Sequence, residues 1–203
     1  MFPIEVDEKE SAPGAGGGPY YELPVRYAAV RQADLLVSHK RVGRDAMAGE
    51  DAYPKRVQHR EYGGPREADA RAAVERAAGR LDPGQLLDLT ATVAGGPPVV
   101  VADPRVEAGA SPRYVCVVGN QRCLSLDWAL ERFPLRWAAY AHALAHRAAL
   151  YGLGAAEREW IGGAAAAVAA LRDAGAASDA LRAAAPVLVR VLDASSLGRR
   201  GDL

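Results

Sequence analysis

The stretch that most constrains the fold is residues 114–133, YVCVVGNQRCLSLDWALERF, because its hydrophobic period changes in the middle. Residues 114–118 are apolar and mostly β-branched, a pattern that predicts a short buried strand. After Gly119 the apolar residues recur every three or four positions, which is typical of one face of a helix. The sequence therefore predicts a strand, a tight Gly-Asn turn and a helix that ends near Phe133.

The turn between this strand and this helix is a candidate anion site. If the helix begins at Asn120 or Gln121, the N–H groups of its first turn have no acceptor inside the helix, and the helix dipole adds partial positive charge there. Arg122 lies in that first turn, where its guanidinium could hold a phosphate through two hydrogen bonds. A plain strand-to-helix connection is the alternative, in which Arg122 pairs with a carboxylate such as Asp127 or Glu61 and anchors the loop.

Length and composition indicate a globular protein without an overall basic charge. The chain has 203 residues, half of them hydrophobic, with 25 Lys+Arg and 25 Asp+Glu. The charge balance gives no sign of nucleic-acid binding, although a local patch could still bind DNA. The two cysteines, Cys116 and Cys123, fit neither a disulfide framework nor a zinc site, and we interpret them as buried, reduced thiols. An acidic N-terminus and the lack of a long apolar stretch predict a cytoplasmic protein without membrane contact.

Composition divides the chain into four regions. Residues 1–24 are charged and then rich in Gly and Pro, so we expect a disordered tail. Residues 25–133 mix strand and helix signals and predict a small α/β (α+β) domain with a mixed sheet. Residues 134–197 are Ala-rich and predict a helical C-terminal region, and residues 198–203 form a short tail.

Within the α/β region, the pattern at 27–38 predicts a strand with a bend or a strand pair. Pro65 suits the start of a helix. Asp82 can cap a second, short helix. Residues 99–101 predict a buried strand that pairs with the strand at 114–118.

The C-terminal region is expected to form three helices. The first begins at Pro134 and ends at Gly152, and the second covers about 157–174. The third would begin at Ser178 and continue to Leu192, with a kink or a break at Pro186.

Six short motifs follow one another between residues 25 and 133. In order, they lie at 33–39 (ADLLVSH), 53–54 (YP), 58–62 (QHREY), 81–83 (LDP), 96–100 (GPPVV) and 114–122 (YVCVVGNQR). This succession resembles the ParB/sulfiredoxin superfamily, and most closely its DdrB-like ParB domain branch, which occurs in phage, plasmid and other mobile-element proteins. The chain departs from that branch at Val118, where a second Gly is usual, and the Ala-rich C-terminal region lies outside the resemblance.

The resemblance implies a small mixed-sheet fold whose Gly-x-x-Arg turn holds the phosphates of a bound nucleotide. Members of the superfamily include DNA clamps, proposed nucleases, a kinase and sulfiredoxin, so the fold leaves the reaction open. Sulfiredoxin chemistry is not expected, because Cys123 follows the arginine instead of preceding it. The expected phosphate- or nucleotide-binding residues are Gly119, Asn120, Gln121 and Arg122, assisted by His39, Gln58 and Arg60.

Three functions fit these observations. The first is a nucleotide- or phosphate-binding domain that acts in a DNA transaction of a mobile element; the nucleotide is unspecified. The second is a Mg²⁺-dependent nuclease in which Glu61 is the general base or a metal ligand and Asp34 lies near the metal. The third is a non-catalytic module whose Ala-rich helices bind a protein partner or a second copy. For His39, Arg60 and Glu61 the alternative is a solvated or locally hydrogen-bonded loop residue.

One further pair of residues has metal-ligand spacing. His142 and His146 are four residues apart on the first predicted C-terminal helix, which suits metal binding. No Glu follows the first histidine and no third ligand is near in the sequence. We therefore interpret them as solvated or packed side chains and predict no metal site.

Overall fold

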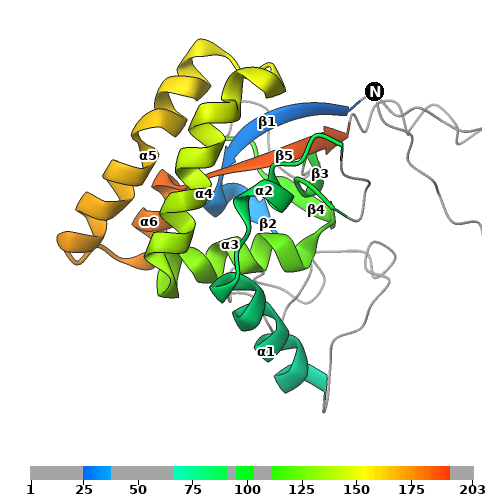
Figure 1. Cartoon of the computed structure of the whole chain (residues 1–203), viewed down its shortest axis with the longest axis vertical. Coiled ribbons are helices and arrows are strands. Elements are labelled where there is room, and N and C mark those ends of the chain that lie inside the picture. Colours follow the sequence, from blue (N-terminus) through cyan, green and yellow to red (C-terminus); the bar gives the residue numbers. More distant parts are fainter. Residues whose placement is uncertain (1–24, 38–65, 91–94, 103–110, 193–203) are drawn as a thin grey trace, which may run out of the picture.

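A single mixed sheet forms the centre of the fold (Figure 1). The structure is a computed structural model that describes residues 25–37, 66–90, 95–102 and 111–192, so the two predicted tails lie outside the described residues. The strand order is β1-β5-β3-β4-β2, in which β1/β5 and β3/β4 are antiparallel and β5/β3 and β4/β2 are parallel. The predicted mixed-sheet α/β class is therefore confirmed. The strands are β1 (Val25–Arg31), β2 (Leu35–Leu36), β3 (Val99–Ala102), β4 (Tyr114–Val118) and β5 (Pro186–Leu192).

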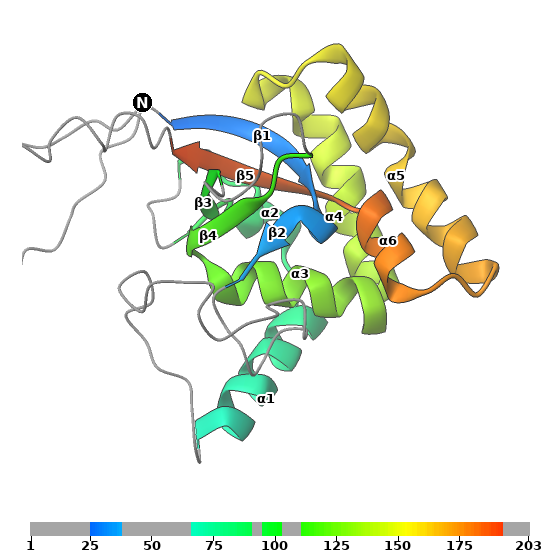
Figure 2. The same cartoon turned by 180° about the vertical axis from the view of Figure 1, so that it is seen from behind.

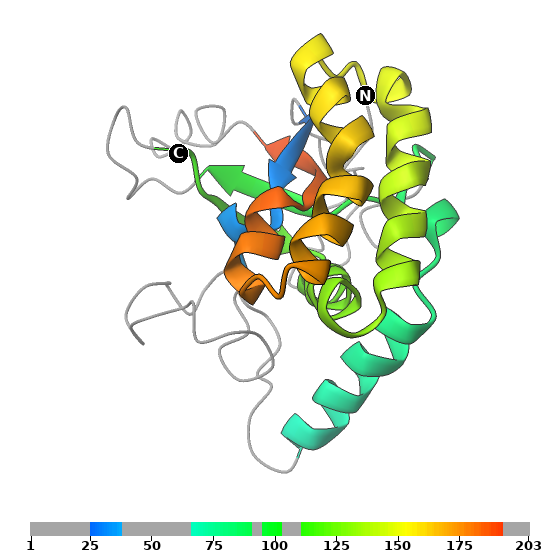
Figure 3. The same cartoon turned by 90° about the vertical axis from the view of Figure 1, so that its left-hand side faces the viewer.

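Helices pack around this sheet. Figure 3 shows α4 and α5 side by side with α6 next to α5, whereas Figures 1 and 2 show α1 extending away beyond α3. None of the helices within the described ranges is both long and apolar enough to cross a membrane. The helices are α1 (Arg66–Gly79), α2 (Pro83–Leu86), α3 (Asn120–Arg132), α4 (Pro134–Arg147), α5 (Ala155–Asp173) and α6 (Ser178–Ala184), with short 3₁₀ turns η1 (Gln32–Asp34) and η3 (Ala148–Tyr151).

Several local predictions are confirmed. Helix α3 begins at Asn120, directly after β4, and β4 pairs with β3 as expected. The bend in 27–38 is η1, which separates β1 from β2. Asp82 caps α2, because its Oδ1 accepts a hydrogen bond of 2.8 Å from the N–H of Gly84. The first two helices of the C-terminal region also form, as α4 and α5.

The prediction of a third C-terminal helix that continues to Leu192 is wrong. Helix α6 ends at Ala184, and the residues from Pro186 onward form β5, which lies between β1 and β3 in the sheet. Proline at 186 lacks an N–H donor and cannot extend the preceding turn. The valines that alternate along β5 also favour extended backbone. Residues 134–197 are therefore not a purely helical addition, because they supply a central strand of the sheet.

The helical spacing that led to this error has a physical cause. All residues of β5 except Leu192 are buried, so apolar side chains occur on both faces of the strand. A strand covered on both faces has no alternation of polar and apolar residues that would reveal a period of two. Ala185, Leu188 and Leu192 therefore fit the spacing of an apolar helix face, although the residues from Pro186 onward form a strand.

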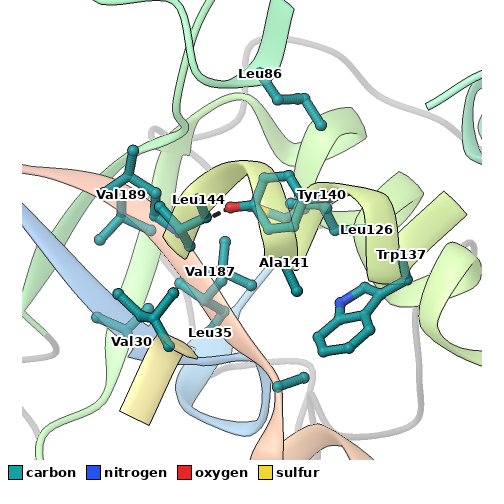
Figure 4. Packing of buried hydrophobic residues seen from close by; sticks show 14 of the residues in the cluster. Val30, Leu35, Leu86, Leu126, Trp137, Tyr140, Ala141, Leu144, Val187 and Val189 are labelled. Atoms are coloured by element: carbon teal, nitrogen blue, oxygen red, sulfur yellow. Dashed lines mark hydrogen bonds between the residues drawn. The ribbon is translucent and has the colours of Figure 1, made fainter. Parts of the chain in front are cut away.

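The core joins α4 to β5 (Figure 4). Trp137, Tyr140 and Leu144 are almost fully buried and face β5. The hydroxyl oxygen of Tyr140 accepts a hydrogen bond of 2.9 Å from the N–H of Leu188. Strand β3 pairs only with the last three residues of β5, which come after Leu188. The Tyr140 hydroxyl therefore serves as the acceptor for the Leu188 N–H in place of a neighbouring strand. Burial raises the pKa of Tyr140 above its ordinary value, and the hydroxyl stays neutral.

Candidate functional site

The turn between β4 and α3 depends on Gly119. Its φ of 99° lies in the left-handed region that favours glycine, and its carbonyl accepts the N–H groups of Arg122 at 2.9 Å and Cys123 at 3.1 Å. A Cβ at position 119 would lie 2.6 Å from Nη2 and 2.7 Å from Nε of Arg122. The Arg122 side chain thus folds back over the glycine, and this close approach needs the space that a missing side chain leaves.

Arg122 contacts the loop that precedes β3. Its Nη1 donates to the carbonyl oxygens of Gly95 and Gly96, each at 2.5 Å. Burial lowers the pKa of Arg122, although a guanidinium stays charged in proteins. The Asp127 carboxylate, considered as a partner of Arg122, accepts a hydrogen bond of 2.8 Å from Nε of Arg182 on α6.

A second arginine, Arg190 of β5, reaches the same loop. Its Nε donates to the carbonyl of Pro97 at 2.9 Å, and its Nη2 donates to the carbonyl of Gly95 at 2.8 Å. Its backbone N–H donates to the carbonyl of Pro98 at 2.7 Å. The residue is 5% exposed. The sequence pattern does not single out Arg190, because it predicts a helix over this stretch; the available signal is a single charged residue inside the apolar run VLVRVL.

Two guanidinium groups therefore share one acceptor, the Gly95 carbonyl. Burial lowers the pKa of Arg190, and the positive charge of Arg122 lowers it further. Two unit charges roughly 5 Å apart repel each other by about 3 kcal/mol at an effective dielectric constant of about 20. An anion bound beside both groups would offset this repulsion. Arg122 and Arg190 therefore gather positive charge beside the loop that precedes β3.

Tyr27 lies next to Arg190, one of these two arginines. It is opposite Arg190 in the antiparallel register of β1 and β5, so the two side chains are on the same face of the sheet. Its ring packs against the ring of Tyr151, with centroids 5.2 Å apart. Burial raises the pKa of Tyr27, and the charge of Arg190 partly opposes this rise. Tyr27 thus gives this side of the site a neutral aromatic ring.

The two cysteines lie on either side of the turn, in the core. Both are fully buried, and their Sγ atoms are 3.6 Å apart. The hydrogen bond with Cys123 and then burial raise the pKa of Cys116 well above its ordinary value. A neutral, inaccessible thiol is a poor nucleophile. The prediction of two buried, free thiols is confirmed, and Cys123 points into the core as expected.

The other predicted site residues have different outcomes. Gly119 to Arg122 come together at the start of α3, as their sequence requires. His39, Gln58, Arg60 and Glu61 lie outside the described residues, so their place near the turn stays a prediction. Asp34 pairs with Arg31, whose Nε donates to Oδ2 at 2.5 Å.

No group of three or more His, Cys, Asp or Glu residues is arranged to hold a metal ion within the described ranges. Comparisons of the chain with family models, with curated proteins and with solved structures found no match.

Proposed function

We propose that this chain binds a nucleotide or another phosphate compound at the Gly119 turn and acts in a DNA transaction of a phage, plasmid or other mobile element. The observation that carries the proposal is the convergence of Arg122 and Arg190, from α3 and β5, on the carbonyl of Gly95. The role in a DNA transaction follows from the resemblance of the six ordered motifs to DdrB-like ParB domains.

The chemistry of the turn suits a phosphate. Guanidinium groups bind phosphate oxygens through paired, charge-assisted hydrogen bonds. The first N–H of α3 that bonds within the turn is that of Arg122, so the N–H of Gln121 has no acceptor inside the helix. The dipole of a 13-residue helix favours negative charge at the same end. The hydrogen bonds to residues 95–97 use one nitrogen of Arg122 and two of Arg190, and a phosphate would bind in exchange for some of them.

A thermal-shift screen of nucleotides, with and without Mg²⁺, tests the proposal. A ligand present at 100 times its dissociation constant adds about 2.7 kcal/mol to the free energy of unfolding. We expect Arg122→Ala to abolish the shift and Arg122→Lys to weaken it, because an ammonium group cannot reproduce a planar, two-point contact. Arg132→Ala is the matched control. Arg132 is also on α3, but it pairs with Glu75 at 3.3 Å near the other end of the helix.

The opposite result is equally clear. If Arg122 only anchors the loop at residues 95–96, Arg122→Ala lowers the melting temperature while the affinity for the best ligand stays at the parent value. Unchanged affinity in Arg122→Ala would remove the proposed site.

A further inference from the structure

The outer face of α4 carries two histidines that the candidate phosphate site does not use. His142 and His146 are both exposed, whereas Trp137, Tyr140 and Leu144 on the other side of the helix are buried in the core. Neither imidazole has a hydrogen bond or an ion pair with another described residue. Of the two interpretations, solvated or packed, the structure therefore supports solvated side chains, and both residues are open to solvent.

Their arrangement is that of a chelating pair. Residues four apart on a helix lie one above the other, with Cβ atoms about 5–6 Å apart. Both positions fall inside α4, which runs from Pro134 to Arg147 and is fixed by its buried side. The backbone that carries the ligands is thus already ordered before any ion binds. Because the rings are exposed, a hydrated ion can reach them without crossing the protein.

We propose that His142 and His146 form a surface site for one divalent transition-metal ion of the kind that prefers imidazole, such as Zn²⁺, Ni²⁺ or Cu²⁺. The two imidazoles supply two ligands, and water fills the remaining positions, since no third His, Cys, Asp or Glu joins them in the part of the chain that the structure describes. Affinity should be highest for Cu²⁺, following the general order for nitrogen ligands. Mg²⁺ should not bind, because it requires oxygen ligands.

Isothermal titration of the full-length chain, without an affinity tag, tests this site with ZnCl₂, NiCl₂ and CuCl₂, and with MgCl₂ as the negative control. The parent protein should bind one Zn²⁺, and His142→Ala and His146→Ala should each lose that one-to-one phase. Both substitutions place the best helix-forming residue at an exposed position, so the variants should stay folded, which circular dichroism checks.

A spacing variant separates chelation from the mere presence of two imidazoles. Combining His142→Ala with Ala139→His keeps the number of histidines but places them seven residues apart, about 10 Å along the helix axis. On a straight helix both imidazoles then reach one ion only with their side chains stretched toward each other, so the one-to-one phase should weaken markedly. Zn²⁺ binding that persists in this variant and in His142→Ala, but falls in a variant lacking His39 and His59, would overturn the proposal. Failure of the parent to bind Zn²⁺, Ni²⁺ or Cu²⁺ saturably would do the same.

Discussion

Substitution of Gly119 by alanine tests whether the Arg122 side chain packs over the turn. Two separate costs follow from the structure. The left-handed backbone at φ 99° is unfavourable for any residue with a Cβ, by about 1–2 kcal/mol. The new Cβ would also lie 2.6 Å from Nη2 of Arg122, so the guanidinium must move.

The second cost can be estimated from the hydrogen bonds that the guanidinium makes. Moving the end of a flexible side chain is itself cheap, but here the movement breaks the bonds to the carbonyls of Gly95 and Gly96. Bonds from a charged donor contribute about 1.5–3 kcal/mol. With two such bonds lost, Gly119→Ala should therefore lower the free energy of unfolding by about 4–8 kcal/mol in the parent. In an Arg122→Ala background only the backbone cost of about 1–2 kcal/mol should remain.

Equilibrium unfolding in urea measures this double-mutant cycle. Gly152→Ala is the matched control, because Gly152 also has a positive φ, of 66°, but a Cβ there would meet nothing within 4 Å. Its cost should be the same with and without Arg122. If Gly119→Ala costs the same in both backgrounds, within about 0.5 kcal/mol, the guanidinium does not occupy the space over the glycine.

Two further predictions concern buried polar groups. Arg182→Ala should lower the free energy of unfolding by about 3–5 kcal/mol, because it removes the guanidinium from the buried carboxylate of Asp127. Arg31→Ala is the control: it breaks a more exposed pair with Asp34 and should cost at most about 1 kcal/mol. Equal losses in the two variants would contradict this reasoning. Tyr140→Phe should cost about 1–3 kcal/mol in the same urea assay, because the N–H of Leu188 loses its acceptor inside the core, and a cost near zero would mean that this N–H finds another partner.

Local sequence was sufficient for the β4–α3 unit. A change from an apolar run to a period of three or four, with glycine at the change, allows few other folds, and α3 begins at the first residue that the pattern permits. The same holds for the cap at Asp82 and for α4, which begins at Pro134. In each case the deciding interaction joins residues that are close in the sequence, so propensity and spacing carry the information.

Arg190, the part of the candidate site that the sequence does not reveal, depends on an interaction between distant parts of the chain. Arg122 and Arg190 come together only because β5 enters the sheet beside β3, and the alternative helix over the same residues would have placed residue 190 elsewhere. A charged residue in a strand that is buried on both faces is costly unless its donors are satisfied. Here the carbonyls of Gly95 and Pro97 satisfy Arg190. An isolated arginine in an otherwise apolar run therefore indicates that another segment supplies hydrogen-bond acceptors for it. Here the Gly-Gly-Pro-Pro turn before β3 supplies them, because its carbonyl groups are not paired within a regular helix.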